Sequence, residues 1–180
     1  MQAEPAGRIV VIAAASRHGS TSTIAERIEL TLRQQLSPPW SVRWADLLDL
    51  RTFDEADAVV LGSAVYVGHW LRPALNALRH AKDAPLLGLW LFSSGPISDD
   101  MDENARVVSA DEMVESGFAT EHKVFAGRLD TVDLARWERL VVRAVGVVSG
   151  DRRDWAAVDA WATSIASQLT ASVAASGAGS

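Results

Sequence analysis

Six consecutive residues near the start of the chain have the composition of an anion-binding loop. They are Ser16, Arg17, His18, Gly19, Ser20 and Thr21. The hydroxyl groups among them are hydrogen-bond donors, and Gly19 lets the backbone approach a ligand closely. The chemistry that such a loop offers is the binding of phosphate.

The segments on either side of this loop predict where it lies in the fold. Residues 9–15 are apolar and rich in β-branched side chains, which is typical of a buried parallel strand. After the loop, apolar residues recur every four positions, as on one face of a helix: Ile24, Ile28, Leu32 and Leu36. Thr23 followed by Glu26 predicts a capping box, so we expect the helix to begin just past the loop.

A loop between the end of a strand and the start of a helix is a favourable place for an anion. The first N–H groups of a helix lack helical partners, and the helix dipole is positive at this end. We therefore predict a phosphate site at residues 16–21. The alternative is a serine-rich loop that binds nothing.

The rest of the chain alternates between strand-like and helix-like segments. The predicted strands are residues 9–15, 40–45, 58–65, 85–92 and 122–126. The predicted helices follow residue 23 and occupy segments near 71–78, 103–116, 131–148 and 154–169. This alternation predicts an α/β fold in three layers, α/β/α, around a five-stranded parallel sheet in the order 2-1-3-4-5. The helix at residues 131–148 is additional to this plan.

Ligands of such sheets bind at the carboxyl ends of the strands, where the strand order reverses. Residues 63–69 and 93–96 should meet the first loop there, and both segments are small, polar and glycine-bearing. The candidate binding residues in these two segments are Ser63, Ala64, Val65, Tyr66, Val67, Gly68, Ser93, Ser94 and Gly95. No side chain in the three loops is a clear general acid, base or nucleophile, so we predict no catalytic residue.

Composition narrows the classes of function. A chain of 180 residues with a net charge of −6 fits one domain and argues against nucleic acid as a partner. The absence of cysteine excludes disulfides and thiol nucleophiles, and the histidine spacing predicts no metal site. We expect a domain at residues 8–170 between flexible segments at 1–7 and 171–180. Without a membrane-spanning stretch or a signal pattern, the expected location is the cytoplasm.

Several segments resemble one known family. Residues 16–21 resemble the phosphate loop of flavodoxins, with His18 in place of the middle threonine. Residues 56–70, ADAVVLGSAVYVGHW, are similar to the third strand and flavin loop of the flavodoxin-domain family that includes menaquinone-dependent protoporphyrinogen oxidase. Residues 124–130, VFAGRLD, and 150–155, GDRRDW, resemble the C-terminal signatures of that family.

This resemblance implies a flavodoxin-like fold with FMN as cofactor. The first loop would hold the phosphate, residues 63–68 would follow the isoalloxazine ring with Tyr66 stacked on it, and residues 93–95 would close the other side. The implied activity is that of an FMN-dependent oxidoreductase passing electrons from a reduced substrate to a quinone-type acceptor. A non-catalytic electron carrier with a protein partner, or a flavin-free interaction module, remains open. Many carriers are acidic around the flavin, whereas this loop contains Arg17 and His18.

The tripeptide Arg17-His18-Gly19 also resembles the signature of histidine phosphatases. In that family His18 would be the nucleophile that accepts phosphate. The reaction needs a second histidine and a second arginine, and none of the histidines at 69, 80 and 122 has the sequence context of that family. Phosphatase activity therefore remains an alternative, but the second histidine that it needs is not recognisable in the sequence.

The predicted helix at residues 131–148 has arginines near one polar face, namely Arg136, Arg139 and Arg143. Three interpretations fit this face: exposure to solvent, a lip over the flavin, or a weak contact with a membrane surface. The sequence does not separate these three interpretations.

Overall fold

The structure is a computed structural model, and it describes residues 7–66, 68–95, 108–129, 150–151 and 153–177. At its centre lies a parallel sheet made of β1 (Arg8–Ala15), β2 (Trp40–Trp44), β3 (Ala58–Tyr66), β5 (Gly88–Gly95) and β6 (Glu121–Ala126). These strands are ordered β2-β1-β3-β5-β6. A short β4 (His69–Trp70) pairs with β3 outside this path. The predicted α/β fold and strand order are confirmed.

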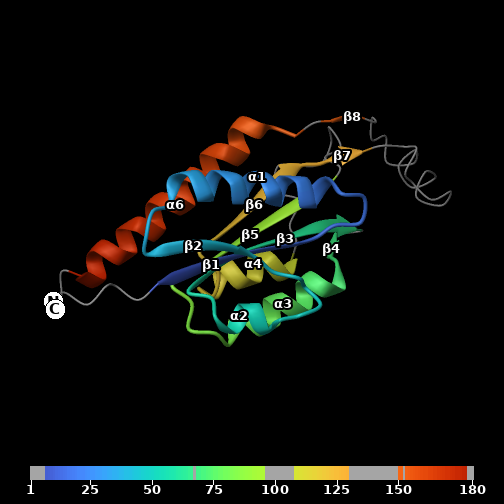
Figure 1. Ribbon diagram of the computed structural model, residues 1–180. Coiled ribbons are helices and arrows are strands. Elements are labelled where there is room, and N and C mark those ends of the chain that lie inside the picture. The colour runs from blue at the N-terminus through green and yellow to red at the C-terminus, as the bar shows by residue number, and fades with distance from the viewer. Residues whose placement is uncertain (1–6, 67, 96–107, 130–149, 152, 178–180) are drawn as a thin grey trace.

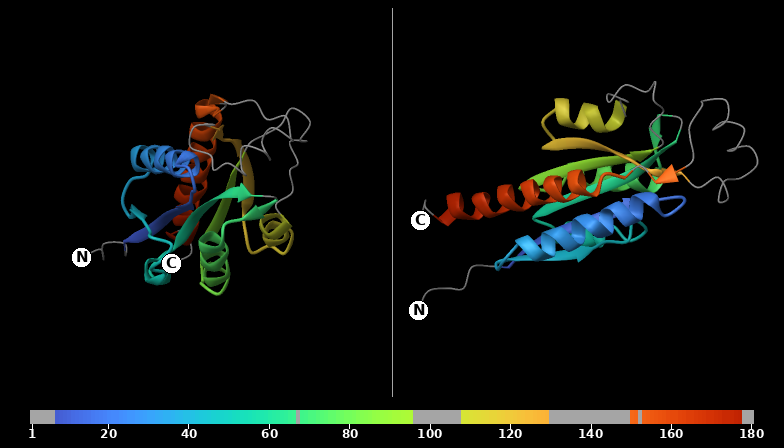
Figure 2. Two further views of the ribbon diagram at one scale, coloured as in Figure 1. Left: turned by 90° about the vertical axis from the view of Figure 1, so that its right-hand side faces the viewer. Right: turned by 90° about the horizontal axis from the view of Figure 1, so that it is seen from above.

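Helices cover both faces of the sheet (Figures 1 and 2). One face carries α1 (Ser20–Gln35) and α6 (Trp155–Gly177). The other face carries α2 (Arg51–Asp54), α3 (Arg72–Lys82) and α4 (Val108–Glu115). Among the described residues, no helix is both long and apolar enough to cross a bilayer.

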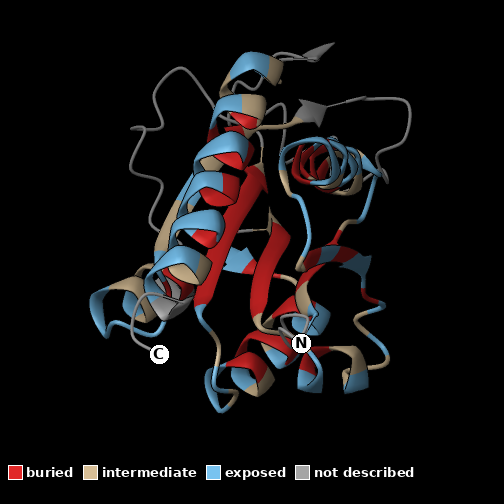
Figure 3. Ribbon diagram, turned by 60° about the vertical axis from the view of Figure 1, so that its left-hand side comes forward, coloured by how far each residue is buried: buried red, intermediate tan, exposed pale blue. Residues whose placement is uncertain are grey.

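Alternation along the strands divides the interior into two cores. Val10 and Ile12 of β1 face α1 and α6, whereas Val11 and Ala13 face the opposite helices. Figure 3 shows the buried strands between helices whose outer faces are exposed. The apolar stripe predicted for α1 is correct through Leu32, and its fully buried members are Ile24, Ile28 and Leu32. Burial of each such side chain contributes about 2 kcal/mol, which fixes α1 and its N-terminus over the sheet.

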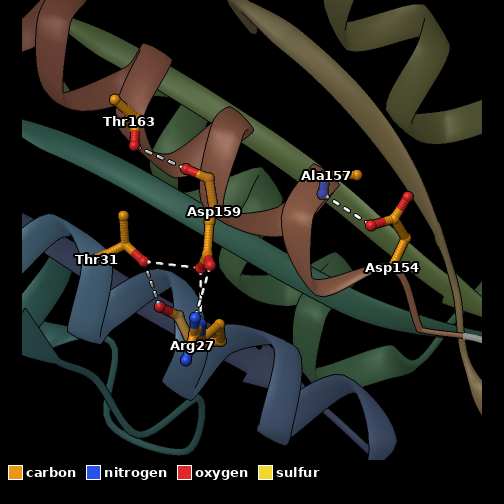
Figure 4. A network of polar contacts seen from close by, with 6 residues as sticks. All are labelled: Arg27, Thr31, Asp154, Ala157, Asp159 and Thr163. Atoms are coloured by element: carbon orange, nitrogen blue, oxygen red, sulfur yellow. Dashed lines mark hydrogen bonds and ion pairs between the residues drawn. The ribbon is translucent and has the colours of Figure 1, made fainter.

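A polar contact joins the two helices on the first face (Figure 4). Arg27 of α1 donates two hydrogen bonds of 2.6 Å to the Asp159 carboxylate of α6. Thr31 donates to the same carboxylate over 3.1 Å. The hydrogen bond from Arg27 lowers the pKa of Asp159. Asp154 accepts a hydrogen bond of 3.0 Å from the Ala157 N–H at the start of α6, as an N-cap residue does.

The start of α1 differs from the prediction. The N-cap is Gly19, and Thr23 lies inside the helix, where its hydroxyl donates to the Gly19 carbonyl over 3.0 Å. The predicted capping box is therefore wrong. Gly19 has φ of 81°, so the backbone turns from the loop into the helix at this residue. Ser20 and Thr21 consequently belong to the first turn of α1.

Two predicted loops contain strand instead. Residues 63–66 continue β3, and β4 turns back to form a hairpin in which Val65 pairs with Trp70 and Tyr66 with His69. Gly68, with φ of 75°, provides the positive φ that a tight hairpin turn needs. Residues 93–95 continue β5, because β3 pairs with Ser93 and Ser94 on one side and β6 pairs with all three residues on the other.

Other differences lie toward the C-terminus. A two-stranded pair, β7 (Arg128–Leu129) and β8 (Gly150–Asp151), was not expected from the sequence. Helix α6 continues to Gly177, through most of the segment expected to be a flexible tail, and Val173 packs against the core. The predicted helix at residues 131–148 and the predicted loop at 97–102 lie outside the described residues.

Candidate functional site

The N-terminus of α1 faces the carboxyl end of the sheet without a side-chain cap. The first hydrogen bond of the helix runs from the Thr23 N–H to the Gly19 carbonyl over 3.0 Å. The N–H groups that precede it have no partner within the helix. The first turn contains no acidic residue, so nothing in it repels a negatively charged group. This end of α1 has the electrostatics of an anion site.

Ser16 provides the most specific indication of a ligand-binding site. Its Oγ atom is buried and has no hydrogen-bond partner among the residues that the structure describes. Leaving a buried hydroxyl unsatisfied costs about 1–3 kcal/mol. Ser16 directly follows β1 and lies in the loop that leads into α1. A phosphate oxygen held at this helix terminus would satisfy the hydroxyl.

The first and second candidate loops contact each other through Tyr66. The Tyr66 hydroxyl and the His18 Nε2 atom are 3.1 Å apart. The Arg17 guanidinium lies over the Tyr66 ring, with Cζ 4.8 Å from the ring centroid. Tyr66 was predicted to stack on a flavin, and in this arrangement one face of its ring is covered by Arg17. The tyrosine thus joins the end of β3 to the loop after β1.

Gly127 brings the end of β6 to the same place, and sequence reasoning did not select it. Its N–H donates to the Gly95 carbonyl over 3.0 Å. A Cβ atom at this position would lie 3.2 Å from Ser94 Oγ and 3.4 Å from Ser20 Oγ. Only glycine allows this approach without displacing its neighbours. The available signal was a glycine directly after the fifth predicted strand.

Ser63 and Ser93 lie on the sheet face beneath α3 and α4, and their hydroxyls bond within the protein. The Ser63 hydroxyl donates to the Ala64 carbonyl over 2.9 Å and accepts from the Leu71 N–H over 3.0 Å. The Ser93 Oγ contacts Trp70 Nε1 and His122 Nε2, each at 2.8 Å. Both serines are fully buried. In this structure they support the walls of the site from inside.

The remaining predicted residues are distributed around these contacts. Val65 packs near the end of β5, because a Cβ atom on Gly95 would lie 3.5 Å from its Cβ. Gly68 is exposed at the turn of the hairpin, Ala64 is half-buried in β3, and Thr21 is buried in α1. Val67 lies outside the described residues. The loop after β1 and the ends of β3, β5 and β6 therefore meet, whereas the region beyond Gly95 is not described.

The described histidines do not assemble a phosphatase site. His18 contacts Tyr66, as described above. His80 of α3 and Asp54 of α2 are 2.7 Å apart, and His122 of β6 and Asp111 of α4 are 2.9 Å apart. Among the described residues, no contact brings a second histidine to His18.

Comparison with known families decides the classification. The family described as the flavodoxin domain matches residues 11–155 of this chain. The chain belongs to the flavodoxin-domain family. No curated protein sequence matches it. Members of this family bind FMN and transfer electrons.

Solved structures share the fold at low sequence identity. A flavodoxin from the domain Archaea superposes with a TM-score of 0.58 at 16% identity, covering 90% of this chain and 99% of its own. A flavodoxin from Streptococcus pneumoniae gives 0.54 at 18% identity, covering 91% and 99%. Rubredoxin oxygen:oxidoreductase from Desulfovibrio gigas gives 0.56 at 16% identity, covering 95% of this chain and 38% of its own. At these identities the likeness concerns the fold alone.

The residues at the strand ends fit the cofactor of this family. An uncapped helix terminus without acidic neighbours suits the phosphate of FMN. The buried, unpartnered Ser16 hydroxyl lies in the loop that leads into this terminus and supplies a further donor. Gly19 and Gly127 keep the backbone close to the site.

Proposed function

We propose that this chain binds FMN at the carboxyl ends of β1, β3 and β5 and acts as an oxidoreductase. The observation that carries the proposal is the Ser16 hydroxyl, which is buried without a partner beside the uncapped N-terminus of α1. A phosphate oxygen bound at this helix terminus would give the Ser16 hydroxyl an acceptor.

The residues of the three segments have different proposed roles. Ser16, Gly19, Ser20 and Thr21 would hold the phosphate through hydroxyl and backbone donors. Arg17 would add positive charge, and Arg17 and His18 together would keep Tyr66 in place, as their contacts already do. Residues 64–68 and 94–95 would flank the isoalloxazine ring. Ser63 and Ser93 would act from within, because their hydroxyls hold α3 and β4.

When bound, FMN supplies the capacity to accept and return electrons. We propose a quinone-type electron acceptor, as in the protoporphyrinogen-oxidase group of the family. In support, the two C-terminal signatures of that group contact each other here: Arg128 pairs with Asp151 and Leu129 with Gly150. Strand β7 of this pair directly follows Gly127, which lies at the site. Figure 1 shows it at the same end of the sheet as β4 and the start of α1.

The residues beside Tyr66, neither of which is acidic, also favour this reaction over simple electron carriage. Arg17 and His18 occupy a position where an acidic surround would suit a carrier that docks on basic partners. A protein partner remains the second candidate, because solved flavodoxins share the fold.

The test is to purify the chain with FMN and examine its absorbance spectrum. The protein should retain one flavin after gel filtration. After anaerobic reduction, menadione should re-oxidise it, with one quinone reduced per flavin because both transfers involve two electrons. Flavin retention without quinone reduction would favour the carrier, and failure to retain FMN would contradict the proposal.

A further inference from the structure

A chain of hydrogen bonds crosses four elements below the proposed flavin site. Trp70 Nε1 of β4 lies 2.8 Å from Ser93 Oγ of β5. Ser93 Oγ lies 2.8 Å from His122 Nε2 of β6, and His122 Nδ1 lies 2.9 Å from Asp111 Oδ1 of α4. The His122 side chain is only 5% exposed, so these groups depend on one another for hydrogen bonding.

The direction of these hydrogen bonds is fixed at the Trp70 end and depends on the tautomer at His122. An indole N–H only donates, so Ser93 Oγ accepts from Trp70. In the tautomer whose single ring proton is on Nδ1, His122 donates to the Asp111 carboxylate and its Nε2 accepts the Ser93 hydroxyl hydrogen. With this tautomer every group in the chain has a partner. Loss of His122 would leave the buried Ser93 hydroxyl hydrogen without this acceptor, whereas the Asp111 carboxylate is 32% exposed and can bind water.

The order serine, histidine, aspartate is that of an acyl-transfer triad, but Ser93 is not placed to attack a substrate. A nucleophile must be reached by the bond that it attacks. Ser93 is fully buried in β5, between β3 and β6, and one side of its oxygen is occupied by the indole of Trp70. This series of hydrogen bonds therefore has a structural role and does not carry out hydrolysis.

The element that these hydrogen bonds hold in place is the β3–β4 hairpin. Strand β4 has two residues and pairs with β3 alone, which is a weak attachment by itself. Trp70 provides the anchor: it is 3% exposed, and its ring lies edge-on to the His122 imidazole, with centroids 6.3 Å apart. The same hairpin carries Tyr66, whose hydroxyl contacts His18 of the phosphate loop. A continuous series of contacts thus leads from α4 to the proposed site.

We propose that His122 is a positioning residue for flavin binding, acting through Ser93 and Trp70 to hold the β3–β4 hairpin beside the isoalloxazine ring. This inference rests on the proposed FMN site. Because the hairpin would act on the ring, its displacement weakens FMN and riboflavin by the same factor, although riboflavin lacks the phosphate.

Another histidine of this protein, His80, provides a matched control. His80 also contacts a carboxylate, Asp54, over 2.7 Å, and lies edge-on to an aromatic ring, that of Phe53, at 6.5 Å. It belongs to α3 and has no contact with the hairpin among the described contacts. His122→Phe should weaken the binding of FMN and of riboflavin about tenfold each, since the hydrogen bond from His122 to the buried Ser93 hydroxyl is lost. His80→Phe should leave both affinities at the wild-type value.

Two further variants separate positioning from general loss of stability. His122→Gln restores an acceptor toward Ser93 and should recover most of the flavin affinity. Trp70→Phe keeps a ring but removes the donor, so it should weaken flavin binding as His122→Phe does. The double variant should be no weaker than either single one, because both remove the same tether. Additive losses, or a loss for FMN alone, would overturn the inference.

Hydrogen exchange of the flavin-free chain completes the test. Exchange in the β3–β4 hairpin should be faster in His122→Phe than in the wild type and unchanged in His80→Phe. If the wild type binds no flavin, the proposed function fails, and the exchange result still decides whether His122 holds the hairpin. If the wild type binds FMN and His122→Phe binds it equally well, only this inference fails. Should His122→Phe not fold, Trp70→Phe decides, and unchanged flavin affinity there overturns the inference.

Discussion

Replacement of Ser16 by alanine should have opposite effects on the free and the FMN-bound protein. In the free chain the Ser16 Oγ is buried without a partner among the described residues. Removing it relieves an unsatisfied hydroxyl, which should raise the free energy of unfolding by about 1 kcal/mol. In the complex the same change removes a hydrogen bond to a charged phosphate, worth about 1.5–3 kcal/mol. FMN affinity should therefore fall about 10- to 150-fold.

Chemical denaturation with and without FMN measures both effects on one sample. The ligand raises stability according to its concentration relative to its dissociation constant. Ser16→Ala should therefore start from a higher stability and gain less from FMN. Thr31→Val is a suitable control, because Thr31 is buried in α1 away from the site and its hydroxyl is bonded to the Arg27 carbonyl and to Asp159. It should lose about 1 kcal/mol without FMN and keep its FMN affinity. If Ser16→Ala destabilises the free chain or binds FMN as tightly as the wild type, the assignment of the phosphate site is refuted.

Three other substitutions test separate parts of the account. His18→Thr keeps a hydrogen-bond donor in the loop and should retain FMN in a spectral titration. The wild type should hydrolyse no p-nitrophenyl phosphate. If the wild type hydrolyses it and His18→Thr does not, the phosphatase interpretation is favoured. Gly62→Ala would place a Cβ atom 2.0 Å from Cζ of Phe92. Urea denaturation should therefore show a free energy of unfolding about 1–3 kcal/mol lower, because the core is overpacked. An unchanged free energy of unfolding would mean that Phe92 can move aside. Asp159→Asn should be less stable than the wild type at neutral pH, because Arg27 lowers the pKa of Asp159 in the folded state. That contribution is present above the unfolded pKa and is lost as the pH falls through the folded pKa, which lies below the ordinary value for an aspartate. The difference in stability should therefore persist at about pH 4 and shrink as the pH falls further; a difference that does not change with pH would contradict the ion pair.

The features that the sequence predicted correctly are those with a repeating physical signal. Apolar runs identified the strands, and the fourfold spacing of Ile24 and Ile28 identified the buried face of α1. The alternation of strands and helices then allowed few topologies, and the observed order is the predicted one. Asp154 was recognisable as a cap because its side chain acts on a residue three positions away.

The errors lie where long-range pairing overrides local sequence. Ser93 and Ser94 resemble turn residues, yet β3 and β6 pair with them on both sides and keep them in β5. Thr23 and Glu26 satisfy the spacing of a capping box, but the backbone freedom of Gly19 starts the helix earlier. The pairing of β7 with β8 joins segments about twenty residues apart, which no local pattern indicates.

The meeting of the strand ends was predicted correctly, and the contacts beneath them were not predicted. The loop after β1 and the ends of β3 and β5 do meet, as their places in an α/β sheet required. His122 and Asp111 were missed because their contact depends on how α4 packs over β6, which the sequence does not show. Gly127 was missed for a similar reason, since only the folded chain brings it to Ser94 and Ser20.

Calorimetric titration of the purified chain with FMN and with riboflavin tests the central claim most directly. The two ligands share the isoalloxazine ring and differ in the phosphate that the N-terminus of α1 is proposed to hold. Several charge-assisted hydrogen bonds at that terminus predict that FMN binds at least about 100-fold more tightly than riboflavin. Equal affinities, or no binding of either ligand, would contradict the claim that this helix terminus is a phosphate site.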